Sequence, residues 1–105
     1  YTQYSTACYT LGFGTNITID WNSGNVQTVT LTGNTTVTFN NALAGGRYSL
    51  IVTQDGTGSR TLSYTNTIKW TNGIAPSLST TSGKTDIITL TYDGTNFYGS
   101  YNLSY

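Results

Sequence analysis

The chain has 105 residues, four basic and four acidic side chains and no histidine, so its formal net charge at neutral pH is zero. The length is that of one ordinary domain, and the charge balance excludes the basic surface with which proteins neutralise nucleic-acid phosphates. Only 8% of the residues are charged, so Thr, Ser, Asn and Gly must supply the polarity of the surface. We therefore expect one domain with a neutral polar surface and no nucleic-acid partner.

The residue types favour strands over helices. Thr is the commonest residue, Tyr occurs nine times and Met is absent, and β-branched and aromatic side chains suit a pleated sheet better than a helix. Cys8 is the only cysteine, so one chain forms no disulfide, and we interpret Cys8 as a small buried hydrophobe. No run of about 18 apolar residues is present, and we expect no membrane insertion.

The first predicted elements are a lead-in and a hairpin. Residues 1–15 are aromatic but not periodic, and we interpret them as an N-terminal arm or irregular lead-in that packs on a neighbouring subunit, followed by a single β-sandwich domain over residues 16–105. From Gly24 onward apolar and polar residues alternate, as in half-buried strands. Val29 and Leu31 share one face of the first strand. Gly33-Asn34 suits a tight turn, which predicts a hairpin with the next strand at Thr36–Asn40.

Five further strands are predicted along the rest of the chain. They are Arg47–Gln54, a strand at Leu62 and Tyr64, another at Ile68 and Trp70, Asp86–Tyr92, and a return after Asp93-Gly94 through Phe97 to Tyr105. Pro76 falls in a loop, because proline donates no hydrogen bond to a sheet. The total of about seven or eight short strands, separated by tight Gly, Asn and Asp turns, predicts an antiparallel β-sandwich, a jelly-roll-like domain or a small barrel.

The stretch QDGTGSRT, residues 54–61, has the residue types of a catalytic or anion-binding loop. The motif T-x-D-G-T occurs at residues 53–57 and again at 91–95, which raises the possibility of two paired carboxylates. Aspartic-protease loops use the order Asp-Thr-Gly, however, whereas Asp-Gly after a strand is a strong hairpin signal. No calcium-loop or phosphate-loop spacing is present either. We interpret QDGTGSRT as a hairpin connection. The turn residues of this stretch and of its repeat are Asp55, Gly56, Gly58, Asp93 and Gly94. Arg60 is interpreted as a clasp that pairs with an acid or covers apolar surface.

No catalytic residue, cofactor or metal ligand set is predicted. Serine and cysteine nucleophiles have no histidine to act as a base, so we expect the protein not to be an enzyme. Four aromatic residues are candidate contacts for a glycan or a protein partner, namely Trp21, Trp70, Tyr98 and Tyr101. Flat aromatic faces stack on sugars, but aromatic residues at strand ends also pack in cores and subunit interfaces, and both interpretations stay open at this stage.

Several separated blocks of the sequence, in order, resemble a β-rich module of tailed-bacteriophage structural proteins of the fibre, appendage or capsid-decoration type. The blocks are residues 25–36 (NVQTVTLTGNTT), 45–48 (GGRY), 54–61 (QDGTGSRT), 69–70 (KW), 73–76 (GIAP), 78–80 (LST), 83–84 (GK), 86–88 (DII) and 92–99 (YDGTNFYG). The resemblance covers about residues 16–99. It implies a non-enzymatic virion component on the particle surface, often homo-oligomeric and commonly trimeric, with no catalytic residues.

Two functions from different classes are consistent with these observations. The first is a virion structural protein, in a capsid decoration, fibre or tail appendage, which assembles with copies of itself and with other virion proteins. The second is a glycan-binding or receptor-binding module that uses exposed Trp and Tyr residues to contact a cell surface. Both place the protein outside the host cell, at the virion surface.

Overall fold

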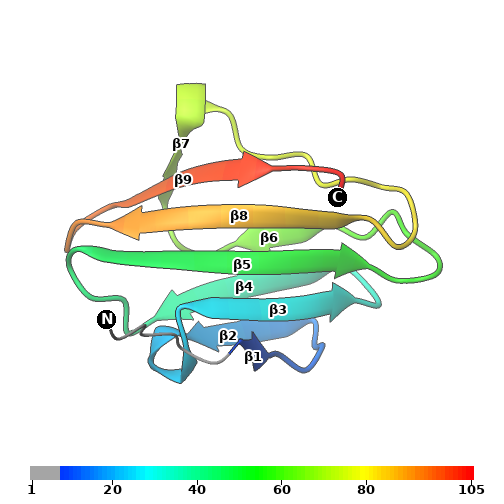
Figure 1. Ribbon diagram of the computed structural model, residues 1–105, viewed down its shortest axis with the longest axis horizontal. Coiled ribbons are helices and arrows are strands. Elements are labelled where there is room, and N and C mark those ends of the chain that lie inside the picture. Colours follow the sequence, from blue (N-terminus) through cyan, green and yellow to red (C-terminus); the bar gives the residue numbers. More distant parts are fainter. Residues whose placement is uncertain (1–7) are drawn as a thin grey trace, which may run out of the picture.

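The computed structural model describes residues 8–105, so Tyr1–Ala7 of the expected arm lie outside the described residues. Over this range the chain forms nine strands and two short 3-10 turns (Figure 1). The elements are β1 (Tyr9–Thr10), β2 (Asn16–Asp20), η1 (Trp21–Ser23), β3 (Val26–Leu31), β4 (Thr35–Asn40), β5 (Gly46–Gln54), β6 (Leu62–Tyr64), β7 (Ile68–Trp70), η2 (Thr71–Gly73), β8 (Thr85–Tyr92) and β9 (Phe97–Asn102). The predicted all-β class is confirmed.

The strands form two sheets, one of six strands in the order β1-β3-β5-β8-β9-β7 and one of three strands in the order β2-β4-β6. From β1 to β6 the chain alternates between the sheets, so odd-numbered strands lie in the larger sheet and even-numbered strands in the smaller one. Within each sheet these neighbours are parallel. The first six strands therefore wind as a coil, of the kind found in β-solenoids.

The C-terminal strands depart from the parallel coil and include antiparallel pairs. Strand β8 pairs antiparallel with β5, β9 pairs antiparallel with β8, and β7 lies parallel to β9 at the edge of the larger sheet. Figure 1 shows β5 and β8 as the longest strands, running side by side in opposite directions. The β5–β8 pair thus joins the coil to the C-terminal strands.

The core lies between the two sheets, and it is formed by the apolar residues that alternate with polar residues along the strands. Apolar residues that alternate with polar ones point inward from both sheets, among them Val29, Leu31, Val37, Leu50 and Leu90, all nearly or fully buried. An internal row of aromatic rings runs through the same layer, from Trp21 through Phe39 and Tyr64 to Trp70. This packing of sheet on sheet confirms the sandwich-like architecture.

The expected antiparallel pairing is wrong for most of the chain. Strands β3 and β4, predicted to form a hairpin across Gly33-Asn34, belong to different sheets, and so do β5 and β6 on either side of QDGTGSRT. An alternating strand needs one buried face, and both sheets bury a face in the same core, so alternation does not select the partner. At Asp93-Gly94 the chain does join antiparallel neighbours, β8 and β9. Neither sheet bears out the jelly-roll alternative.

The N-terminal region differs from expectation in two further respects. Tyr9 and Thr10 of the lead-in form β1 and pair with β3, and β2 adds a strand before those expected from Gly24 onward. Its sequence NITID alternates, with Ile17 and Ile19 buried, so the signal for β2 was present. Cys8 is exposed and is not the buried hydrophobe expected. Within residues 8–105 no helix has the length and apolar character needed to cross a membrane.

Candidate functional site

The loop that follows β5 is built around the carboxylate of Asp55. Its Oδ1 accepts hydrogen bonds from the backbone N–H groups of Thr57 (3.1 Å) and Gly58 (3.0 Å), and Arg60 forms an ion pair with its Oδ2 at 3.2 Å. The Gly58 N–H and the Arg60 side chain hold the pKa of Asp55 below its ordinary value of 3.8. The structure thus places Asp55, Gly58 and Arg60 in one closed turn, within a crossover between the two sheets.

The buried Gln54 side chain ties this loop to a second one, the segment between β7 and β8. Gln54 is only 3% exposed, and its amide Nε2 donates to the carbonyl oxygens of Arg60 and Ser79, each at 2.9 Å. Its Oε1 accepts from the backbone N–H of Arg60 at 3.0 Å. All three hydrogen bonds run from the Gln54 side chain to backbone atoms of the two loops, so Gln54 fixes the distance between these loops.

Asp86, on β8, also holds the segment between β7 and β8 in place. It is 1% exposed, and it accepts hydrogen bonds from the backbone N–H and the hydroxyl of Ser79, both at 2.7 Å, and from the backbone N–H of Ser104 at 2.9 Å. Sequence reasoning assigned Asp86 only to a strand. The signal that could have singled it out is a charged residue at an inward position of an alternating strand.

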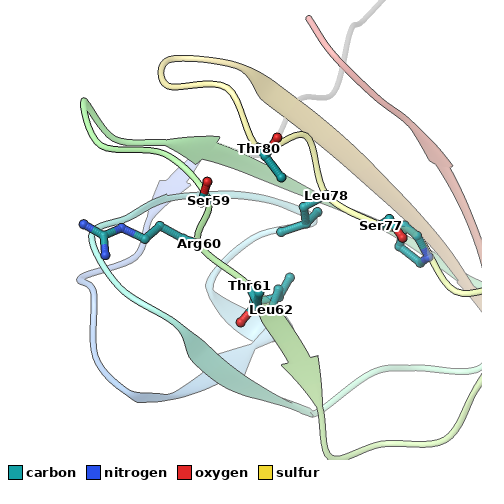
Figure 2. Close-up of a pocket in the computed structure, with 8 residues that line it drawn as sticks. Ser59, Arg60, Thr61, Leu62, Ser77, Leu78 and Thr80 are labelled. Carbon is teal, nitrogen blue, oxygen red and sulfur yellow. The ribbon is translucent and has the colours of Figure 1, made fainter.

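The two loops enclose a groove of about 320 Å³ on the surface of the protein. Its lining residues are Ser59, Arg60, Thr61, Leu62, Pro76, Ser77, Leu78 and Thr80; we call it the crossover groove. Figure 2 shows Thr61 and Leu62 on one wall and Ser77 and Leu78 on the other, while the guanidinium of Arg60 points away from them. The groove is therefore lined by the aliphatic stem of Arg60, with its charged end outside.

The second Asp-Gly loop lies at the opposite end of the larger sheet. Asp93 Oδ1 accepts from the backbone N–H groups of Asn96 (2.6 Å) and Thr95 (2.8 Å), which together hold the pKa of Asp93 below 3.8. Because β5 and β8 are antiparallel, the loops after them are separated by the length of these strands. The structure does not bring Asp55 and Asp93 together, and residues 8–105 contain no group of three or more His, Cys, Asp or Glu that could hold a metal ion.

The four aromatic candidates lie in three separate places. Trp21 is 3% exposed and stacks on Tyr48 with ring centroids 4.7 Å apart, which removes it from the candidate glycan contacts. Trp70 and Tyr101 meet edge to face at 5.9 Å on the core side of the larger sheet. Tyr101 also lines a smaller hollow of about 290 Å³, whereas Tyr98 is 45% exposed on the outer face of β9. No shared aromatic platform results.

The outer faces of the two sheets differ in composition, a difference that becomes visible only once the pairing is known. On the six-stranded sheet, the partly exposed Ile51 and Ile87 are paired across β5 and β8, and Val26 lies on neighbouring β3. On the three-stranded sheet, the corresponding outward positions are all polar or charged, namely Asn16, Thr18, Asp20, Thr36, Thr38, Asn40 and Ser63. Only the larger sheet therefore presents apolar side chains outward.

Comparison with known protein families finds a match for most of the chain. The family model described as "Putative phage tail fibre C-terminal domain" matches residues 8–97, a range that includes strands β1 to β8 and both Asp-Gly loops. No curated protein and no solved structure matches the chain.

Proposed function

The chain belongs to the phage tail fibre C-terminal domain family, and from this premise we propose that it is a non-enzymatic module that assembles with copies of itself, as a trimer, at the virion surface. Membership of the family supports a structural role in the tail fibre and assembly with other virion proteins. The absence of histidine from the sequence and the separation of Asp55 from Asp93 support the non-enzymatic part of the proposal.

The observation that carries the assembly proposal is the contrast between the two outer sheet faces. The outer face of the six-stranded sheet has Ile51 and Ile87 at its centre, surrounded by Thr and Ser side chains of β3, β5 and β8. The charged residues of this face, Arg47 and Lys69, lie at the start of β5 and on the edge strand β7. Charge is depleted in the cores of protein interfaces, and this face has such a centre.

A second copy of the chain is the partner that this face fits best. The face is wide, and its centre contains no charge that would repel the same surface of another copy. Each contact of a cyclic trimer joins two different patches of the chain, and two different parts of this wide face would contact the two neighbouring copies around the threefold axis. The three-stranded sheet, with polar or charged side chains at every outward position, offers no comparable apolar centre.

Native mass measurement of the purified chain tests the proposal. We expect the wild-type protein to be a trimer and Ile87→Arg to dissociate it, because the substitution places a charge at the interface centre. Thr38→Arg, on the outer face of the smaller sheet, is the matched control and should leave the trimer intact. A wild-type chain that stays monomeric at all concentrations, or an Ile87→Arg variant that still forms trimers, would contradict the proposal.

The alternative function, glycan binding through exposed Trp and Tyr, has less support from the structure. Trp21 is buried, and Trp70 and Tyr101 pack on the core side of the sheet, so Tyr98 is the only one of the four candidates with a largely exposed ring. Lys69 and Thr91 lie beside Tyr98, but a single ring on a flat sheet face offers no concave pocket in which a ligand could be buried.

A further inference from the structure

Two buried glutamines hold crossover connections at opposite ends of the sandwich. Gln54 holds the connection after β5, and Gln27, on β3, holds the connection between β2 and β3. The amide Nε2 of Gln27 donates to the carbonyl oxygens of Asp20 (2.7 Å) and Gly24 (3.0 Å), which lie on either side of η1. Because β3 and β5 are parallel, the start of β3 and the end of β5 lie at opposite ends of the larger sheet, as Figure 1 shows.

The two amides differ in what their oxygen atoms accept. Gln54 Oε1 accepts a hydrogen bond from the backbone N–H of Arg60 at 3.0 Å. Gln27 is 0% exposed, and its Oε1 has no hydrogen-bond partner among residues 8–105. Most buried polar groups in proteins are paired with a protein group or with ordered water, because an unpaired buried acceptor carries its full desolvation cost. Gln27 Oε1 therefore needs a donor.

The indole of Trp21 has the complementary need. Within the described part of the chain, its Nε1–H is the other buried side-chain polar atom without a partner. Trp21 is the first residue of η1, the turn whose ends Gln27 holds, and its ring stacks on Tyr48 of β5. Tyr48 and Leu50 share the inward face of β5, and Leu50 is opposite Gln27 in the register of the sheet. The unpaired donor and the unpaired acceptor thus belong to one region of the core, between η1, β3 and β5.

We propose that an ordered water molecule binds between Trp21 and Gln27, where it accepts a hydrogen bond from the indole Nε1–H and donates one to the amide Oε1. The two atoms make no direct hydrogen bond, so a group that joins them must accept and donate at once, as water does. Both side chains are buried and uncharged, and an ion would lie there without a counter-charge. Buried waters typically make two to four hydrogen bonds to such otherwise unpaired groups.

The water gives Gln27 Oε1 the donor that Gln54 Oε1 obtains from the backbone of Arg60. The two carbonyl bonds of Gln27 hold the ends of η1, and the water adds the first residue of the turn, Trp21, to the same support. A water-mediated hydrogen bond is enthalpically almost as favourable as a direct one. The site lies within one chain and is independent of the assembly proposed above.

A crystal structure of the full chain, at a resolution that shows ordered water, tests the proposal. We expect a water oxygen at about 2.5–3.2 Å from both Trp21 Nε1 and Gln27 Oε1, the range of protein hydrogen bonds. A direct hydrogen bond between the two side chains, or a protein group in place of the water, would overturn the proposal.

Water–protein Overhauser measurements on the ¹⁵N-labelled chain test the same site in solution. Trp21 and Trp70 are the only tryptophans, and we expect the indole N–H of Trp21 to give a cross-peak to water with the sign of a long-lived contact. The Tyr48 hydroxyl stacks near this indole and exchanges its hydrogen with water, so Tyr48→Phe is the control. The cross-peak should persist in Tyr48→Phe, and its loss there would refute a bound water.

Two matched variants test the role of Gln27. Gln27→Met keeps the length of the side chain but removes both polar atoms, and we expect it to abolish the Trp21 cross-peak. Gln54→Met makes the same change at the other end of the sandwich and should leave the cross-peak intact. A folded Gln27→Met protein that keeps the cross-peak would show that Gln27 does not bind the water. If Gln27→Met does not fold, the wild-type crystal structure and the Tyr48→Phe measurement still decide the proposal.

Discussion

Gly58 offers the sharpest test of how the crossover groove is built. Its φ is +75°, in the left-handed region, and an added Cβ would meet the Thr80 carbonyl oxygen at 2.4 Å and the Ser82 nitrogen at 2.9 Å. These are backbone atoms, and the hydrogen bond from Ser59 to Thr80 holds that backbone close. We therefore expect Gly58→Ala to push the two loops apart and to destabilise the fold.

Two other glycines separate the effect of the left-handed backbone conformation from the effect of the steric clash. Gly83 has the same φ of +75° but no atom within 4 Å of an added Cβ, and Gly56 has neither a positive φ nor a close neighbour. The left-handed conformation costs a non-glycine residue about 1–2 kcal/mol, and a steric clash in packed surroundings adds about 1–3 kcal/mol. The expected losses are about 3 kcal/mol for Gly58→Ala, about 1 kcal/mol for Gly83→Ala, and within about 0.5 kcal/mol for Gly56→Ala.

Urea unfolding followed by tryptophan fluorescence measures all three losses, provided that the slope of the transition stays constant across the variants. The order of the three values matters more than their absolute size. If Gly58→Ala were no more destabilising than Gly83→Ala, the close approach of the two loops would not be a feature of the protein in solution. The account of a fixed groove would then be refuted.

Two further predictions concern the carboxylates. Asp86→Ala removes the acceptor of three hydrogen bonds at a buried site and should lower the free energy of unfolding by about 3 kcal/mol or more; a loss under about 1 kcal/mol in the same urea assay would show that Asp86 is not needed. For Asp55 and Asp93, whose pKa values are lowered in the folded state, the stabilisation is present above pH 3.8 and is lost as the pH falls through the lowered values. The double variant Asp55→Asn, Asp93→Asn keeps a side-chain oxygen that can accept the hydrogen bonds of both turns, so assembly at neutral pH should persist. Its free energy of unfolding should fall less steeply below pH 3.8 than that of the wild-type protein. If both proteins lost stability equally as the pH falls, the role of these hydrogen bonds would be contradicted.

The sequence predicted the strands much better than their partners. Val29 and Leu31, which share one face of the first predicted strand, are buried, and so are Tyr48, Leu50 and Ile88 on two other strands that the alternation predicts. That inference is local, because a period of two reports only that one face of a strand is covered. The pairing of β3 with β5 joins Val26 to Ser49, and no local signal specifies a partner at that distance along the chain.

The site was harder to predict for the same reason. The QDGTGSRT loop was correctly seen as rich in polar groups, but its neighbour across the groove is the segment around Ser77 and Thr80. A tight hairpin at Asp55 would have placed β6 beside β5, and the loop would have faced only solvent. Gln54, which makes the link to Ser79, was regarded as the last residue of a strand, because an amide in an alternating strand has no distinguishing local pattern.

The crossover topology explains why one short stretch can serve both the fold and a site. In a hairpin, the connecting residues only reverse the chain. In a coil of two sheets, each connection must span the core from one sheet to the other, so it passes the end of the sandwich and meets whatever other segment lies there. Here that segment is the one leading into β8, and Gln54, Gly58 and Ser59 all make their long-range contacts with it. The connection between β5 and β6, residues 55–61, is longer than the connection between β3 and β4, residues 32–34. The additional residues provide the length from which a groove can be formed. The buried amide of Gln54 holds this longer loop in place through its hydrogen bonds to Arg60 and Ser79.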